Sequence, residues 1–112
     1  MSELEALRER LREFAAARDW EQYHSPKNLA SALIVEAAEL LEHFQWLTQQ
    51  QSRALPPEKL REVEEEIADV LLYLVRLADL LGIDPIDAAH RKIARNEEKY
   101  PAHLVRGSAD KR

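Results

Sequence analysis

The stretch that decides the fold is PEKLREVEEEIADVLLYLVRLADLLG, residues 57–82. Its apolar residues recur at alternating steps of three and four positions, the heptad spacing of a helix that packs along one side. They are Leu60, Val63, Ile67, Val70, Leu74, Leu77 and Leu81. Pro57 suits the first turn of a helix, and Gly82 suits the position just after its end. The stretch therefore predicts one long helix that opens at Pro56-Pro57 and ends near Leu81.

The composition extends this prediction to the whole chain. Of the 112 residues, 64 are Ala, Leu, Glu, Arg or Lys, whereas Val, Ile and Thr together number 11 and glycine appears twice. A β-sheet needs β-branched residues and tight turns, so this composition favours an all-α protein. The length allows one domain, which we expect over residues 1–104, followed by a flexible tail over residues 105–112.

Three further helices follow from their caps. Ser2 and Glu5 have the spacing of a capping box, which predicts a helix over about 3–18. Ser25-Pro26 starts a second helix that we extend to about Gln49, and Asp84-Pro85 starts one that ends before Pro101. Residues 19–28 and 50–55 are then connectors. The predicted architecture is a bundle of four helices.

Several function classes are disfavoured by what the chain lacks. It has no cysteine, no apolar run near the roughly 18 residues that span a bilayer, and an acidic N-terminal segment where a signal peptide is basic. These features favour a cytoplasmic protein without a membrane partner. The net charge of −5 argues against binding to a nucleic-acid polymer, which relies on excess Lys and Arg.

Two acid pairs stand beside the apolar stripes of their helices, Glu36 with Glu39 and Glu66 with Asp69. Each pair is spaced at i and i+3, so its side chains lie on the same face, whereas Glu42 falls on the far side of its helix. If the two helices pack antiparallel, four carboxylates converge and need a cation. Oxygen ligands suit Mg²⁺, Mn²⁺ or Ca²⁺, and Mg²⁺ commonly bridges to phosphates.

Other interpretations of the same residues remain open. The acids are also compatible with a solvated flank, and the heptad seam with a non-catalytic helical oligomer or partner-binding module. A di-iron bundle would need Glu-x-x-His on two helices. That motif is missing here, because the residue three positions before His43 is Leu40 and the residue three positions before His90 is Asp87.

The spacing E-x-x-E, 26 residues, E-x-x-D resembles the signature of the MazG-like all-α nucleoside triphosphate pyrophosphohydrolases, in particular the dCTP pyrophosphatase branch. The segments that carry the resemblance are residues 19–46, 65–84 and 92–101, about half the chain. It implies Mg²⁺-dependent cleavage between the α- and β-phosphates, with Mn²⁺ as a possible substitute, in an intertwined homotetramer with sites at subunit interfaces. One departure is Leu11, where members of this branch often carry a histidine that helps hold the base.

The resemblance also implies roles for individual residues. Glu36, Glu39, Glu66 and Asp69 correspond to metal ligands. Trp20, His24, Trp46 and Tyr73 correspond to residues that contact the base and sugar, and Lys92 and Asn96 to residues near the phosphates.

Physical arguments bear on these roles independently. A carboxylate not fully committed to metal can accept a proton from water, so Glu36 and Glu39 are both candidates for the general base. Lys92, Asn96 and Lys99 share one helix face, which suits phosphate but equally suits a solvated basic face near a helix C-terminus. Residues 67–81 are apolar on nearly every side, which predicts that copies of the chain associate.

Overall fold

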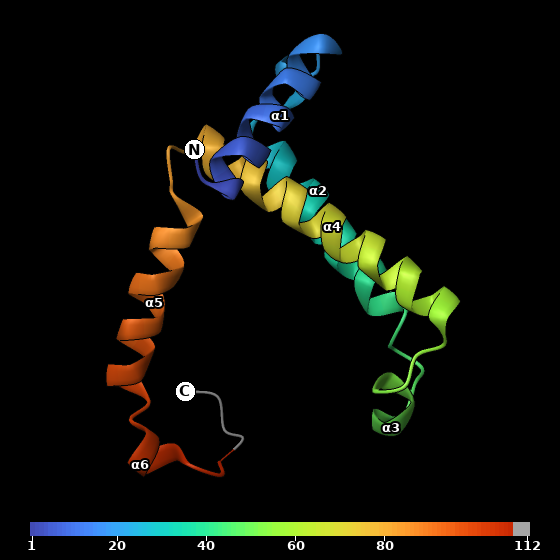
Figure 1. Cartoon of the computed structure of the whole chain (residues 1–112), viewed down its shortest axis with the longest axis vertical. Coiled ribbons are helices and arrows are strands. Elements are labelled where there is room, and N and C mark those ends of the chain that lie inside the picture. Colours follow the sequence, from blue (N-terminus) through green and yellow to red (C-terminus); the bar gives the residue numbers. More distant parts are fainter. Residues whose placement is uncertain (109–112) are drawn as a thin grey trace. The chain divides into compact units, whose positions relative to one another are not determined.

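The computed structural model describes residues 1–108, and in that range the chain forms helices and turns without a strand, as predicted. The chain divides into two compact units, the first from Met1 to Gly82 and the second from Ile83 onward. Each unit is described by itself below. The elements are α1 (Glu3–Ala17), a 3-10 turn (Glu21–Tyr23), α2 (Pro26–Glu42), α3 (Gln49–Ser52), α4 (Pro57–Leu80), α5 (Pro85–Lys99) and α6 (Ala102–Val105) (Figure 1).

The predicted helix starts are confirmed by the caps. Ser2 accepts a hydrogen bond from the backbone N–H of Glu5, whose side chain reaches back to complete a capping box. Ser25 accepts from Asn28 N–H at the start of α2, and Asp84 accepts from two backbone N–H groups at the start of α5. Each cap satisfies donors that the first turn of a helix leaves free.

The prediction that the second helix reaches Gln49 was wrong, because α2 ends at Glu42. Residues 43–47 form turns, with Phe44 N–H donating to Leu41 C=O at 2.8 Å. Thr48 then starts the short helix α3 by accepting from Gln51 N–H, and Gln51 closes a capping box. This cap competes with continuation of the preceding helix, since Thr48 must leave helical geometry to make it.

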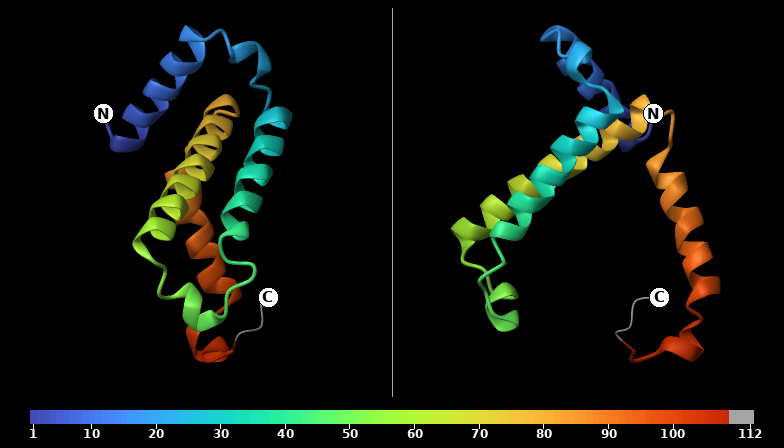
Figure 2. Two further views of the ribbon diagram at one scale, coloured as in Figure 1. Left: turned by 90° about the vertical axis from the view of Figure 1, so that its right-hand side faces the viewer. Right: turned by 180° about the vertical axis from the view of Figure 1, so that it is seen from behind.

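Helices α2 and α4 form an antiparallel hairpin that dominates the first unit (Figure 2). The core lies where the two helices meet and where α1 packs on α4, and its buried apolar residues are Ala15, Leu29, Val63, Val75 and Ala78. The antiparallel arrangement brings early α2 beside late α4. Glu36 and Glu39, in the second half of α2, therefore lie at the level of Glu66 and Asp69 near the middle of α4.

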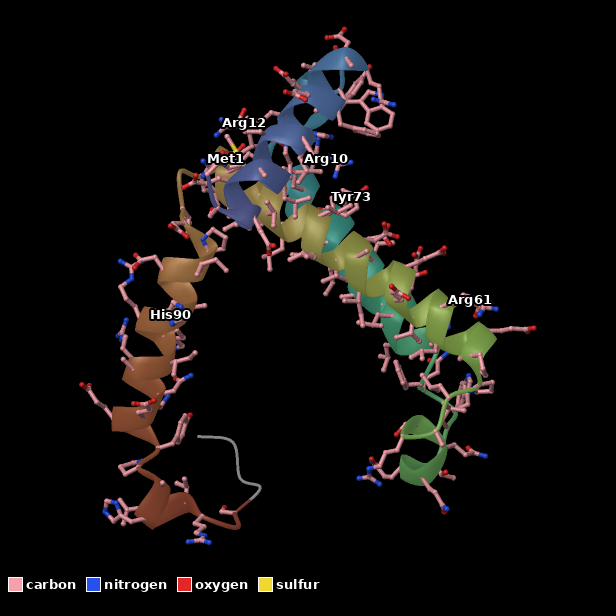
Figure 3. The ribbon with its side chains drawn as sticks, viewed as in Figure 1. Met1, Arg10, Arg12, Arg61, Tyr73 and His90 are labelled. Atoms are coloured by element: carbon pink, nitrogen blue, oxygen red, sulfur yellow. The ribbon has the colours of Figure 1, made fainter. Side chains whose placement is uncertain are left out.

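A cluster of charges joins α1 to α4. Arg12, labelled on α1 in Figure 3, donates through both Nε and a terminal nitrogen to Asp79 on α4, with an Nε to Oδ2 distance of 2.7 Å. Arg8 and Arg76 also approach the Asp79 carboxylate, at 3.8 and 3.6 Å. The bidentate Arg12 pair is the strongest geometry available to these groups, and it fixes α1 against the end of α4.

The second unit contains α5 and the short helix α6. Its α5 begins at Pro85 and ends at Lys99, as the sequence predicts. The first residue of the expected tail 105–112 belongs to α6, and residues 109–112 lie outside the described residues. Within residues 1–108, no helix is both long enough and apolar enough to cross a bilayer.

Candidate active site

Three of the four predicted acids meet between α2 and α4. One carboxylate oxygen from each of Glu36, Glu39 and Glu66 lies within 4.8 Å of the other two. Asp69 is exposed and stands outside this group of three. We call Glu36, Glu39 and Glu66 the acid cluster. Such a cluster places like charges in close contact, which is unfavourable unless protons or a cation compensate it.

Burial increases the electrostatic cost of bringing these carboxylates together. The Oε2 atoms of Glu36 and Glu66 are both buried, and among the described residues neither has a hydrogen-bond partner. Burial, followed by the neighbouring carboxylates, raises the pKa of Glu36 to about 7. Burial, followed by the charge of Glu39, likewise raises the pKa of Glu66. Carboxylate oxygens that are buried and receive no hydrogen bond are ligands that a hard divalent cation accepts, so these residues fit such a cation.

The rim of the acid cluster carries a basic side chain and an imidazole. His43 Nε2 lies 4.0 Å from Glu66, and its Nδ1 lies 3.7 Å from Glu62 and 3.3 Å from Lys59 Nζ. Lys59 in turn forms an ion pair with Glu62 at 3.1 Å. The exposed side of the cluster is thus bordered by groups that can donate hydrogen bonds to an anion.

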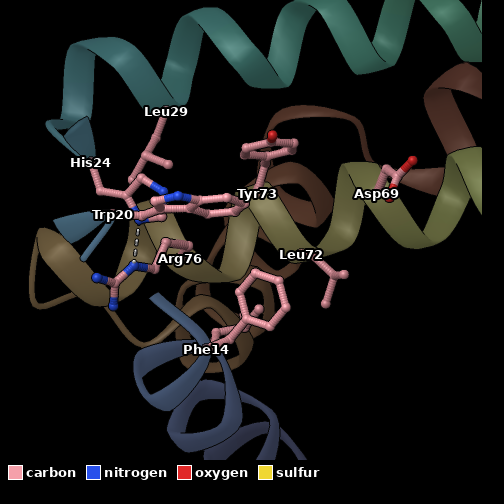
Figure 4. A pocket seen from close by; sticks show the side chains of 9 residues that line it. Phe14, Trp20, His24, Leu29, Asp69, Leu72, Tyr73 and Arg76 are labelled. Atoms are coloured by element: carbon pink, nitrogen blue, oxygen red, sulfur yellow. Dashed lines mark hydrogen bonds between the residues drawn. The ribbon is translucent and has the colours of Figure 1, made fainter. Parts of the chain in front are cut away.

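A pocket of about 270 Å³ opens beside the hairpin, and we call it the aromatic pocket (Figure 4). Its walls come from α1, the loop after α1, α2 and α4. They consist of Leu11, Phe14, Trp20, His24, Leu29, Asp69, Leu72, Tyr73 and Arg76. This lining combines an apolar interior with a few polar groups, as is usual for sites that bind small molecules.

The positions of Trp20 and Asp69 define what the pocket can hold. Trp20 is 45% exposed and packs edge-on against Phe14, with 5.6 Å between ring centroids. Asp69 lines the pocket, and its charge also contributes to the raised pKa values of Glu36 and Glu66. The pocket therefore lies next to the acid cluster, with Asp69 between them. A ligand with a flat ring and a negatively charged tail, neutralised by a cation, matches this arrangement.

His24 is held at the pocket wall by a buried cation. The Arg76 Nε donates to His24 Nδ1 at 3.3 Å, and the dashed line in Figure 4 marks this bond. Burial, followed by the charge of Arg76, lowers the pKa of His24, while Glu21 opposes the shift. The imidazole is therefore neutral at pH 7, and Nδ1 acts as an acceptor in this structure.

Other predicted site residues lie elsewhere. Trp46 is 86% exposed in the turn after α2. It lies outside the helix of Glu36 and Glu39, because α2 ends at Glu42 and not near Gln49 as predicted. Lys92 and Asn96 lie together on α5 in the second unit, where they line a shallow polar depression with Arg95, Glu98 and Lys99. Within the first unit, the structure therefore brings seven of the ten predicted residues to the acid cluster and the aromatic pocket: Trp20, His24, Glu36, Glu39, Glu66, Asp69 and Tyr73.

Arg76 was missed by the sequence reasoning, as were Phe14 and Leu72. The signal for Arg76 was present, because it is a charged residue between Val75 and Leu77 in the most apolar part of the chain. Phe14 and Leu72 carried no such signal, since apolar residues on helices are expected in a core.

Comparison with known proteins places the chain in a family. The MazG-like family profile matches residues 32–109. Mouse dCTP pyrophosphatase 1 is 47% identical over 110 residues, and the human protein of the same name is 44% identical over 110 residues. In both cases the alignment covers 96% of this chain and 65% of the relative, so the chain spans about two thirds of the length of these proteins.

A solved structure agrees with the sequence comparison. The crystal structure of a pyrophosphatase from Archaeoglobus fulgidus superposes with a TM-score of 0.85 at 48% sequence identity. The match covers 90% of this chain and 94% of that one, so the likeness extends over nearly the whole fold. The family profile and the superposition agree with the signature of paired acids on α2 and α4. The chain belongs to the MazG-like family.

Proposed function

We propose that this protein is a nucleoside triphosphate pyrophosphohydrolase that converts dCTP, or a modified dCTP, to the monophosphate and pyrophosphate with the help of Mg²⁺. The observation that carries the proposal is the convergence of three carboxylates beside an aromatic pocket. The relatives named dCTP pyrophosphatase 1 support this choice of substrate, and the archaeal structure, described as a pyrophosphatase, supports the class of activity. The activity would remove unwanted nucleotides from the precursor pool.

The acid cluster would hold the metal. Glu36, Glu39 and Glu66 supply converging oxygens, and Asp69, whose charge acts on Glu66, would be the fourth ligand. When bound, Mg²⁺ neutralises phosphate charge and lowers the pKa of a coordinated water. Burial and the neighbouring carboxylates raise the pKa of Glu36 to about 7. Glu36 and Glu39 both remain candidates for the group that accepts the proton of the attacking water, since either can have an oxygen that is not committed to the metal.

The aromatic pocket would hold the base. Its rings can stack on a flat heterocycle, and Trp20 is exposed enough to be reached. Tyr73 could donate its hydroxyl to the sugar, and His24 could meet the edge of the base. Leu11 lines this pocket where the related enzymes often carry a histidine, so the preference for cytosine rests here on other residues. Lys92 and Asn96 would contact phosphate oxygens, and Trp46 would join the base pocket.

We also propose that the protein assembles as a homo-oligomer, and the family resemblance favours a tetramer. Helices α2 and α4 leave large apolar side chains exposed in the single chain. They include Ile34, Val35, Leu41, Leu60, Ile67, Leu71 and Leu74. Apolar residues repeated along both helices of a hairpin are typical of a subunit interface. A particle of one chain mass by light scattering at micromolar concentration would contradict this part of the proposal.

The test is a panel of ribo- and deoxynucleoside triphosphates with Mg²⁺, in which each product is identified. We expect dCTP to yield dCMP and pyrophosphate, and the reaction to stop when the metal is chelated. Release of dCDP and orthophosphate would mean that a different bond is cut. The alternative, a non-catalytic oligomer or binding module, predicts no product from any triphosphate and no effect of Mg²⁺ on thermal stability.

A further inference from the structure

Arg76 is a buried charged residue in the wall of the aromatic pocket. The proposed chemistry gives this residue no role. It is 8% exposed and lines the pocket three residues after Tyr73 on α4. A guanidinium is rarely buried unless its donors are paired. Two partners satisfy it here: its Nε donates to His24 Nδ1 at 3.3 Å, and its NH1 lies 3.6 Å from Asp79 Oδ2.

Asp79 is itself anchored, so Arg76 is not free to swing. The Asp79 side chain is 9% exposed and accepts two hydrogen bonds from Arg12 of α1. Hydrogen bonding from Arg12 holds the pKa of Asp79 below its usual value, so the carboxylate stays charged. A continuous series of contacts thus runs from α1 through Asp79 and Arg76 to His24. The series ends at the pocket wall.

The bond from Arg76 decides which hydrogen-bonding group His24 can offer. Arg is always protonated and can only donate, so His24 Nδ1 must accept. A neutral imidazole has one N–H, which is then on Nε2. His24 is consequently a donor toward any ligand that reaches Nε2, and it cannot act as an acceptor there.

We propose that Arg76 is a positioning residue that fixes the His24 imidazole as an Nε2–H donor, so that the aromatic pocket selects a flat ring with a hydrogen-bond acceptor on the edge that meets His24. This inference rests on the proposed function for the identity of the ligand. The O2 and N3 atoms of cytosine are acceptors of this kind. A ring with only N–H donors on that edge would leave two donors facing each other, which is costly in a desolvated site.

The bond itself is tested without any substrate. Long-range ¹H–¹⁵N spectra report the tautomer and the pKa of each histidine, and His24→Gln identifies the His24 signals. In the wild type we expect His24 to be neutral at pH 6.5 as the Nε2–H form, with a hydrogen bond accepted at Nδ1. In Arg76→Leu that bond should vanish and the pKa of His24 should rise. Unchanged His24 signals in Arg76→Leu would overturn the inference.

The functional role is tested by a double-mutant cycle on the KM for dCTP. Arg76→Leu and His24→Gln should each raise KM about tenfold, the size expected for one lost hydrogen bond, with kcat changed less than about twofold. Because Arg76 acts through His24, the double variant should be no worse than either single one. Effects that multiply would show that the two residues act separately and would overturn the inference.

Two further variants guard against loss of folding. Arg76→Lys keeps the charge beside Asp79, but a lysine cannot reproduce the fork that reaches both partners, so it should also lose the His24 bond. Arg61→Leu, on an exposed residue of the same helix that projects outward in Figure 3, is the matched control and should leave KM unchanged. An Arg76→Lys variant with wild-type KM and wild-type His24 signals would contradict the positioning role.

Failure of the proposed function can be told apart from failure of this inference. If the wild type released no pyrophosphate, the proposed function would fail, while the spectra would still show whether the Arg76–His24 bond exists.

Discussion

Glu36 on α2 and Glu66 on α4 face each other across the helical hairpin, and each buries one carboxylate oxygen that has no hydrogen-bond partner among the described residues. Two acids in this position destabilise the fold by repulsion and by lost hydration. A divalent cation removes both costs at once. The uncompensated carboxylates therefore destabilise the metal-free protein, and the same carboxylates favour binding of a metal ion.

Metal should stabilise the protein. A ligand that binds only the folded state at a hundred times its Kd adds about 2.7 kcal/mol to the free energy of unfolding, which corresponds to a rise of roughly ten degrees in Tm for a domain of this size. We expect this rise with Mg²⁺ or Mn²⁺ in differential scanning calorimetry, and we expect Glu66→Gln to abolish it. Glu42→Gln, on an exposed acid of α2, is the control and should respond like the wild type. A metal response that survives Glu66→Gln would contradict the assigned site.

Without metal, stability should fall as the pH rises. An acid with a higher pKa in the folded state binds its proton more tightly when folded, so its stabilising contribution is fully present below the unfolded value of about 4.5. For Glu36 that contribution is lost as the pH rises through about 7. Urea unfolding in the presence of EDTA should show a lower free energy of unfolding at pH 8 than at pH 5.5. Glu36→Gln should flatten this slope, and an equally steep slope in that variant would refute the assignment.

Trp20 should contribute binding energy through its ring. Stacking of a base on an aromatic side chain is worth about 1–3 kcal/mol, so Trp20→Ala should raise the KM for dCTP by roughly tenfold or more. Tyr23→Ala is the matched control, because Tyr23 is exposed in the same loop and does not line the pocket. Steady-state kinetics of both variants make the comparison. Equal effects of the two substitutions would indicate a general disturbance of the loop.

Asp79 should stabilise the packing of α1 on α4. Its pKa is depressed, chiefly by the hydrogen bonds from Arg12, so its contribution is present above its unfolded value of 3.8 and is lost as the pH falls through the lower folded value. Asp79→Asn should lower the free energy of unfolding by roughly 1–3 kcal/mol at pH 7, as charge-assisted hydrogen bonds do. The difference from the wild type should shrink below pH 3. A constant difference at all pH values would argue against an ionic contribution.

The sequence predicted the parts of the fold that depend on local signals. The caps at Ser2, Ser25 and Asp84 and the heptad seam of α4 placed the starts of the four long helices correctly. The end of α2 was misplaced because residues 43–47 contain neither proline nor glycine. The signal that marks the break is the capping box of Thr48 with Gln51, which a search for helix starts inside a presumed helix would have found.

The candidate site was predicted in part for a similar reason. Helical spacing placed Glu36, Glu39 and Glu66 on facing stripes, and an antiparallel hairpin was enough to join them. The aromatic pocket depends on how α1 and the following loop pack against α4, which no periodicity encodes. Arg76 owes its place to two partners, His24 and Asp79, that lie 52 residues before it and one turn after it. Such a long-range contact can be seen only in three dimensions.

The measurement that tests the central claim most directly is product analysis of dCTP incubated with Mg²⁺ and either the wild-type protein or Glu66→Gln. We predict dCMP and pyrophosphate in equal amounts from the wild type, and no product from a Glu66→Gln variant whose circular dichroism still shows full helix content. Turnover by Glu66→Gln at the wild-type rate, or release of orthophosphate in place of pyrophosphate, would contradict the account.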